Sequence, residues 1–418
     1  RRRHTRYGTV TGVQTCALPI STSLWNGGAD SPVRKGSAQF YENNFDFQLN
    51  EAYATWRKSY DNMNIAVTGG YSYQKENYNE EYFSLGDFPG DQIDYIDAIE
   101  YSQDLLNAGL ISANSSRNPA TEIEAYFARL NMTIADNFYL NASVRREGST
   151  KLGADNRWGT FPAVGLGADL NSFLGLEGVQ QLKARASYGV TGNLPGGYGL
   201  SQEIRGWSWG GGGSAGGSTG LLRAANPNLK WEEKAELNFG IDLTMDRFSA
   251  TLDIYQQTSK DFIINRIVDA AVYGFDRRFE NAGQLSSDGV ELAVSGTPVL
   301  TDNFRWDLSA NFATLTKTVD FIYPGIDRVI LNSWLAWSSM DLQEIVGEEW
   351  GILIGRRSRK DANGNTVYRS NGTMAYDNNQ IHGNIMPDAT GGITSTMQYK
   401  NWDLTVGIDW QDGGLYHS

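Results

Sequence analysis

The amino-acid sequence predicts an all-β protein, an antiparallel up-and-down transmembrane β-barrel with about 12 strands. Three observations predict this fold class. Segments of about ten residues alternate apolar and polar side chains, and short connections alternate with long ones between these segments. In addition, no window contains the roughly 18 consecutive apolar residues that a membrane helix needs.

Alternation with a period of two gives the strands. Between residues 235 and 245 every second side chain is apolar, and the residues between them are Glu236, Asn238, Gly240, Asp242 and Thr244. Such runs are typical of a strand with one face toward lipid and the other toward a polar interior. In chain order, the predicted strands lie near 45–57, 63–75, 123–135, 138–147, 161–171, 181–190, 233–245, 248–258, 288–298, 303–314, 391–399 and 401–411.

The connections predict the topology. Short turns are expected near Asp61, Asp136, Asp246, Asp302 and Lys400, with a moderately short link at 172–180. Longer connections follow them, among them 259–287 and about seventy-five residues that end at 390. This order would place all short turns at one end of a barrel and all long loops at the other. A soluble sandwich is the alternative, because its Greek-key crossings scatter long loops between both ends.

Trp402 and Trp410 share one face of the last predicted strand. Eight residues span about 26 Å along a strand, and a tilt near 40° reduces this to about 20 Å. The spacing approaches the apolar band of roughly 25 Å that aromatic girdles flank in membrane barrels. The alternative is that both tryptophans lie in a protein core.

Composition excludes several classes of protein. Hydrophobic residues make up 40% of the 418 residues, which fits a barrel because only alternate strand residues face lipid. The net charge of -13 argues against binding of nucleic acid, which requires clustered Lys and Arg. Cys16 is the single cysteine, so no intrachain disulfide can form. The basic segment 1–20 resembles a translated sequencing-adapter junction, and we interpret it as an artefact outside the fold.

The sequence carries no motif that predicts a catalytic, cofactor or metal site. His382 and His417 have no Cys, Glu or His at metal-ligand spacing. The segment that starts at Asp361 resembles a calcium loop, but its glycine, Gly364, stands at the fourth position instead of the sixth. Asn363-Gly364 is therefore predicted to form a hairpin turn within a long loop. We expect no enzyme activity. The alternative is an outer-membrane enzyme that uses a pair of carboxylates.

Four tryptophans in the predicted loops are candidate substrate contacts, namely Trp207, Trp209, Trp334 and Trp337. Aromatic faces pack on sugar rings and other apolar ligand surfaces, and exposed loop aromatics are costly unless they are covered. The alternative is that these rings pack loop against loop in the mouth of a barrel.

Five stretches carry motifs of a known family. They are VRREGSTKLGADNRWGTFPAVGLG from Val144, LKARASYGVTGN from Leu182, ANPNLKWEEKAELNFGIDL with Asn226 to Glu232, NAGQLSSDGVELAVSG, and GNIMPDATGGITSTMQYKNWDLT with Gly383 to Asp403. In these stretches and in this order, the chain resembles the C-terminal barrel half of the SusC/RagA family of TonB-linked outer-membrane transporters.

The resemblance implies the location and the function. The expected location is the outer membrane, where residues 21–418 would form part of a barrel of about 22 strands. The plug domain, the TonB box and the final strands are expected to lie outside this chain, which would leave a curled sheet with two open edges. A SusD-like lipoprotein and the TonB complex are the implied partners, and oligosaccharides or peptides are the implied cargo. A passive porin or a barrel-type adhesin is the alternative function.

Overall fold

The computed structural model describes residues 8–17, 37–86, 112–117, 120–197, 199–209, 217–335 and 340–416. It describes side chains within 42–81, 120–197, 199–203, 223–333 and 340–416. The short helices are η2 (Ala154–Asn156), α2 (Asn171–Leu174) and α3 (Ala270–Tyr273). In the described part of the chain, no helix has the length and apolar character that crossing a membrane requires.

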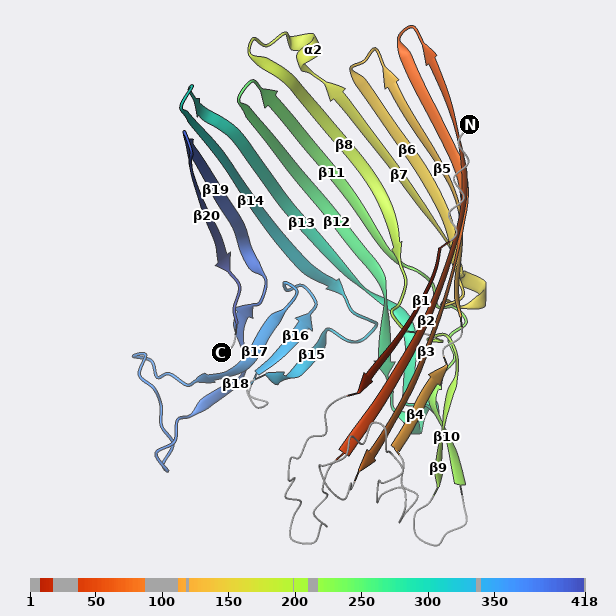
Figure 1. Cartoon of the computed structure of the whole chain (residues 1–418). Helices are drawn as coiled ribbons and strands as arrows, with labels where there is room; N and C mark the ends of the chain where they lie inside the picture. The colour runs from red at the N-terminus through yellow and green to blue at the C-terminus, as the bar shows by residue number, and fades with distance from the viewer. Residues whose placement is uncertain are drawn as a thin grey trace, which may run out of the picture.

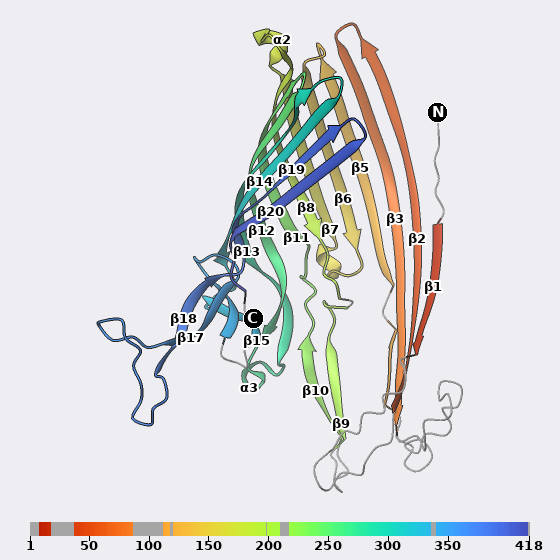
Figure 2. The same cartoon turned by 60° about the vertical axis from the view of Figure 1, so that its left-hand side comes forward.

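A single curled sheet of 16 strands forms most of the molecule (Figures 1 and 2). Its main path, antiparallel at every step, contains β1 (Gly8–Ala17), β2 (Ser37–Tyr60), β3 (Met63–Gly86), β5 (Thr121–Ile134), β6 (Phe138–Ser149), β7 (Trp158–Asp169), β8 (Val179–Asn193), β11 (Glu232–Met245), β12 (Phe248–Ile267), β13 (Arg277–Leu300), β14 (Phe304–Phe321), β19 (Pro387–Tyr399) and β20 (Trp402–Gly413). The short strand β4 (Ser112–Arg117) pairs with β3, and β9 (Ile204–Trp209) pairs with β10 (Gly217–Ala224). The path ends at β1 and β20, which confirms the predicted open sheet.

The twelve predicted strands each overlap one strand of this path, but their bounds were too short. β2, β3 and β13 each contain 24 residues. The predicted long loop at 259–287 is wrong, because β12 continues to Ile267 and pairs with β13 from Arg277 onward. Backbone pairing continues through this extension of β12 and β13, and side chains also pair across it, with Arg266 Nη1 3.3 Å from Glu280 Oε2. β1 lies inside the segment 1–20, which was interpreted as an artefact outside the fold, and it pairs with β2. The origin of that segment stays an interpretation.

The tight turns lie together at one end of the sheet, here named the turn end, at the top of Figure 1. They connect paired strands at 61–62, 135–137, 246–247, 301–303 and 400–401. Ala135, Asp136 and Lys400 have positive φ angles of 50°, 59° and 54°, the left-handed backbone that tight hairpins use. The predicted up-and-down order is therefore confirmed, and we name the opposite end the loop end.

A second sheet of four strands lies within the connection between β14 and β19. It contains β15 (Arg328–Leu335), β16 (Met340–Ile345), β17 (Ile352–Ser358) and β18 (Tyr376–Asn384). A hydrophobic cluster of Leu285, Val319 and Ile322 lies where this connection leaves the main sheet. The backbone N–H of Gly347 donates to the oxygen of Val319 over 2.8 Å, so the second sheet is attached directly to β14.

The two faces of the main sheet differ in polarity. Leu237, Phe239 and Ile241 of β11 point to the face that we name the outer face, where they are 38%, 54% and 48% exposed. Trp402 and Trp410 lie on the same face and are 79% and 42% exposed, so neither is a core residue in this structure. Apolar side chains that stay exposed on several neighbouring strands fit a face that contacts lipid.

Candidate functional site

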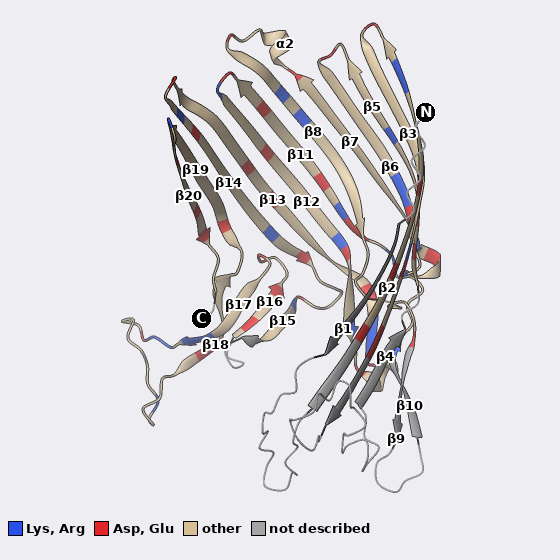
Figure 3. Cartoon of the chain, viewed as in Figure 1, with Lys and Arg blue, Asp and Glu red and all other residues tan. Residues whose placement is uncertain are grey.

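The opposite face, here named the inner face, carries an ion network across β8, β11 and β12. The Nε atom of Arg185 lies 2.7 Å from Asp242 Oδ2, and its Nη2 atom lies 3.0 Å from Asp253 Oδ2. Gly240 leaves room for the guanidinium, because a Cβ there would come within 2.5 Å of Arg185 Cζ. Arg185 of β8 thus binds one carboxylate of β11 and one of β12 with its planar guanidinium. Charged residues of both signs mark these strands in Figure 3.

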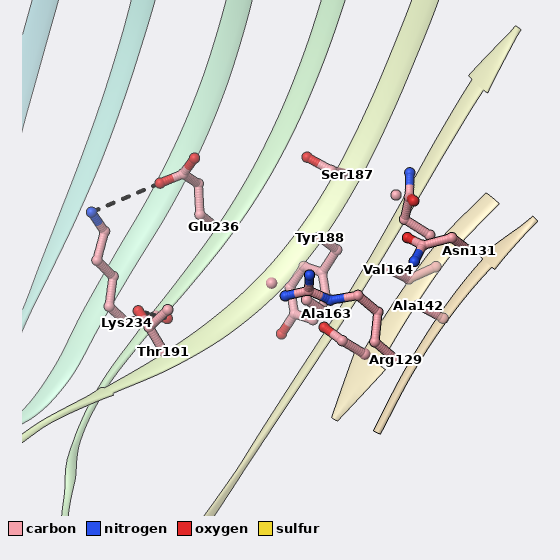
Figure 4. Close-up of a pocket in the computed structure, with 14 residues that line it drawn as sticks. Arg129, Asn131, Ala142, Ala163, Val164, Ser187, Tyr188, Thr191, Lys234 and Glu236 are labelled. Atoms are coloured by element: carbon pink, nitrogen blue, oxygen red, sulfur yellow. Dashed lines mark hydrogen bonds and ion pairs between the residues drawn. The ribbon is translucent and has the colours of Figure 1, made fainter. Parts of the chain in front are cut away.

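A shallow hollow of about 510 Å³ lies on the inner face between β5 and β11 (Figure 4). Its polar lining includes Arg129, Asn131, Ser143, Ser187, Lys234 and Glu236. The Nζ atom of Lys234 lies 3.8 Å from Glu236 Oε2. Hydroxyl, amide and charged groups of this kind hydrogen-bond to hydrated solutes or to polar protein surfaces. No histidine or cysteine lines the hollow, so it offers neither of these nucleophiles.

At the loop end, three of the motif-bearing stretches meet in one packed cluster. Trp231 donates from Nε1 to the backbone oxygen of Arg157 over 2.8 Å. Its ring meets Phe161 edge-on, with 5.3 Å between the ring centroids. Leu152 and Leu229 are 1% and 0% exposed in the same cluster. The connection between β6 and β7 is therefore packed against the segment that enters β11.

Backbone contacts strengthen this junction. Gly153 donates from its backbone N–H to the oxygen of Leu229 over 2.9 Å. A Cβ on Gly153 would overlap the backbone oxygen of Pro227, so only glycine fits at this point. Asn156 donates from Nδ2 to the oxygen of Asn228 over 3.2 Å.

Two asparagines extend the cluster to β13. Asn226, which is 5% exposed, donates from Nδ2 to the oxygen of Phe279 over 2.7 Å. Asn281 donates from Nδ2 to the backbone oxygens of Lys230 and Asp261, each over 2.9 Å. We name residues 152–161, 226–231 and 279–281 the loop anchor. Apart from Phe279 and Glu280, these residues were recognised as parts of motifs, but their contacts with one another were not predicted.

The four candidate tryptophans are not brought together by any described contact. Trp207 and Trp209 lie in β9, and Trp334 lies in β15. The side chains of these three residues and the whole of Trp337 lie outside the described residues. Their predicted contact with substrate stays a prediction.

The described residues offer little for catalysis or metal binding. Among them, no three His, Cys, Asp or Glu side chains are grouped as a metal site requires. His382 lies in β18 with a buried Nε2 atom that has no hydrogen-bond partner in the described part of the chain. His417 lies outside the described residues. The loop at Asp361 forms the predicted turn, in which Gly364 donates to the Asp361 oxygen over 3.0 Å.

Comparisons with known proteins agree with this architecture. The family model "TonB dependent receptor-like, beta-barrel" matches residues 6–413. The TonB-dependent receptor SusC of Bacteroides thetaiotaomicron is 27% identical over 71% of this chain and 31% of its own length. The TonB-dependent receptor P3 of Formosa agariphila is 24% identical over 91% of this chain and 40% of its own length.

Solved structures share the fold. The RagAB peptide importer in its closed-closed state aligns with a TM-score of 0.74 and 20% sequence identity, over 92% of this chain and 43% of that one. The chain thus spans less than half the length of each of these relatives.

Proposed function

The chain belongs to the TonB dependent receptor-like β-barrel family, and from this premise we propose that it forms part of the wall of a transporter that imports oligosaccharides or peptides. Its location is the outer membrane, as both the family and the fold show. The family consists of transporters and not of enzymes.

The observation that carries the proposal is the opposite character of the two faces. The outer face exposes apolar side chains such as Phe239 and Ile241 in a band where lipid would cover them. The inner face of the same strands presents Arg185, Asp242 and Asp253 in a polar network. A wall of this kind separates lipid from a polar interior through which a hydrated solute can pass.

The loop anchor supports the same proposal. It fastens the connection that leads into β7 and the segment that enters β11 to each other and to the start of β13. Long loops that are fixed at their bases keep a defined shape at the mouth of a barrel, which a selective importer requires. We propose that Trp207, Trp209, Trp334 and Trp337 contact the cargo from such loops.

The proposal includes two partners. A SusD-like surface lipoprotein would bind at the loop end, and the TonB complex would supply the energy for import. The RagAB structure is that of a peptide importer, which supports peptides as cargo beside oligosaccharides.

Uptake by cells tests the function. Cells that lack the gene would be complemented with the full-length protein that carries this chain, and uptake of labelled oligosaccharides and peptides would be measured with and without a protonophore. We expect uptake of one cargo class that the protonophore abolishes. Uptake that persists without the proton gradient would indicate a passive porin, and surface adhesion without uptake would indicate an adhesin.

A further inference from the structure

The outer face changes from apolar to charged at a defined level near the loop end. On β6 the residues of this face are Phe138, Leu140, Ala142 and Val144, followed by Arg146. Eight residues separate Phe138 from Arg146, the same spacing as between Trp402 and Trp410 on β20. Arg146 is thus the first charged residue of the outer face of β6 beyond the apolar band. At this level a membrane presents its head groups.

Aromatic rings surround this arginine. Tyr126 of β5 and Trp158 of β7 stack with 6.2 Å between their ring centroids, and they are 51% and 43% exposed. The guanidinium carbon of Arg146 lies 5.8 Å from the centre of the Trp158 ring. Tyr71 of β3 extends the group, with its ring centroid 5.2 Å from that of Tyr126. Amphipathic rings of this kind concentrate where apolar chains meet polar head groups.

Arg146 forms no ion pair with any described residue. By contrast, Lys75 pairs with Glu122 over 3.2 Å, and Lys260 pairs with Glu233 over 3.0 Å. Glu124 on the neighbouring strand accepts a hydrogen bond from the Tyr126 hydroxyl over 2.7 Å. The Arg146 guanidinium, held over an indole ring, therefore keeps its donors for an external anion.

We propose that Arg146, Trp158 and Tyr126 form a binding site for the phosphorylated head group of an anionic lipid in the leaflet at the loop end. The planar guanidinium matches two phosphate oxygens, and the rings lie at the level of the glycerol or sugar part of the lipid. The site needs the wall to be inserted in a membrane, but it does not depend on the cargo or on active transport.

Native mass spectrometry of the full-length protein in detergent with added lipid tests the site. Phosphatidylglycerol is the anionic probe and phosphatidylcholine the zwitterionic one. One arginine near an anionic surface contributes about 1 kcal/mol, so R146Q should lower retention of phosphatidylglycerol about fivefold. Phosphatidylcholine should be little affected, and R146K should keep part of the retention.

The matched control is R129Q, because Arg129 is also an exposed arginine of the wall but lies on the inner face. It should retain phosphatidylglycerol like the unchanged protein. Equal retention by R146Q, or an equal loss in R129Q, would overturn the proposal. Displacement of the lipid by millimolar inorganic phosphate would also overturn it, since the site would then bind free phosphate. Cargo uptake measured in parallel separates failure of this site from failure of the transport function.

Discussion

Trp231 joins two loops that lie 74 residues apart, through the hydrogen bond from its Nε1 atom to the backbone oxygen of Arg157. The ring is 5% exposed and also packs against Phe161. This single side chain thus supplies both a hydrogen bond and much of the hydrophobic contact of the loop anchor.

Replacement of Trp231 by phenylalanine should lower the free energy of unfolding by about 1 kcal/mol, because it removes the hydrogen bond and keeps most of the packing. Replacement by alanine should cost roughly 3–5 kcal/mol, because it also leaves a cavity. Thermal unfolding in detergent measures both. W402F is the control, since Trp402 is 79% exposed, and it should change stability by less than about 0.5 kcal/mol. Equal effects of W231F and W402F would contradict the role of the loop anchor.

Gly153 should not tolerate alanine. The added methyl group would overlap the backbone oxygen of Pro227, and the backbone cannot move away without breaking the hydrogen bond from Gly153 to Leu229. We expect G153A to lower the midpoint of thermal unfolding by several degrees and to increase proteolysis of the neighbouring loops. Gly196 is the control position, because nothing lies within 4 Å of a Cβ there. The prediction fails if G153A and G196A are equally stable.

The network of the inner face should show measurable coupling. Arg185 and Asp253 have side chains that are 32% and 19% exposed, so solvent screens them only in part. A double-mutant cycle with R185Q and D253N should give a coupling of roughly 0.5–1 kcal/mol that decreases with salt. The more exposed pair of Lys260 and Glu233 serves as comparison and should give a smaller value. Coupling that is zero for Arg185 and Asp253 would show that the network does not hold the strands together.

The loop tryptophans should affect uptake and not assembly. If Trp207 or Trp334 contacts the cargo, replacement by alanine should raise the KM of uptake severalfold, since one aromatic stack is worth about 0.5–1.5 kcal/mol. The amount of protein in the outer membrane should stay unchanged. A fall in that amount with an unchanged KM would instead support packing of loop against loop. W402A controls for the loss of an indole ring elsewhere on the wall.

The turn at Asp361 should depend on pH. Its carboxylate accepts hydrogen bonds from the backbone N–H groups of Asn365 and Asn363, over 2.8 and 2.9 Å. These bonds lower the pKa of Asp361 below its ordinary value, the bond from Asn365 having the largest effect. The stabilisation is therefore present above the ordinary carboxyl pKa and is lost as the pH falls through the lowered pKa. Hydrogen-exchange protection of the turn, corrected for intrinsic rates, should fall below about pH 4. D361N should remove this pH dependence, and a transition that persists in D361N would assign it to another group.

The sequence predicted the wall well because its signal is local. In β11 the side chains from Leu237 to Met245 point alternately toward lipid and toward the interior. A membrane strand must alternate in this way, because one of its faces contacts lipid and the other contacts a polar interior. Tight turns such as Asp246-Arg247 are likewise visible in a few residues. The candidate site was predicted less well. The motif that contains Trp231 was recognised, but not the contact of Trp231 with Arg157.

The sequence by itself therefore determined the strand order, the two faces and the turn end, because each depends on neighbours within about ten residues. Only the tertiary structure decided where β12 ends and β13 begins, that β1 pairs with β2, and that a second sheet lies within the connection from β14 to β19. The pairing of β1 with β2 and the attachment of the second sheet depend on hydrogen bonds between residues far apart in the chain, such as Gly347 with Val319. The same holds for the outer face at the loop end, where three strands bring Tyr126, Arg146 and Trp158 together although each alone is an ordinary strand residue.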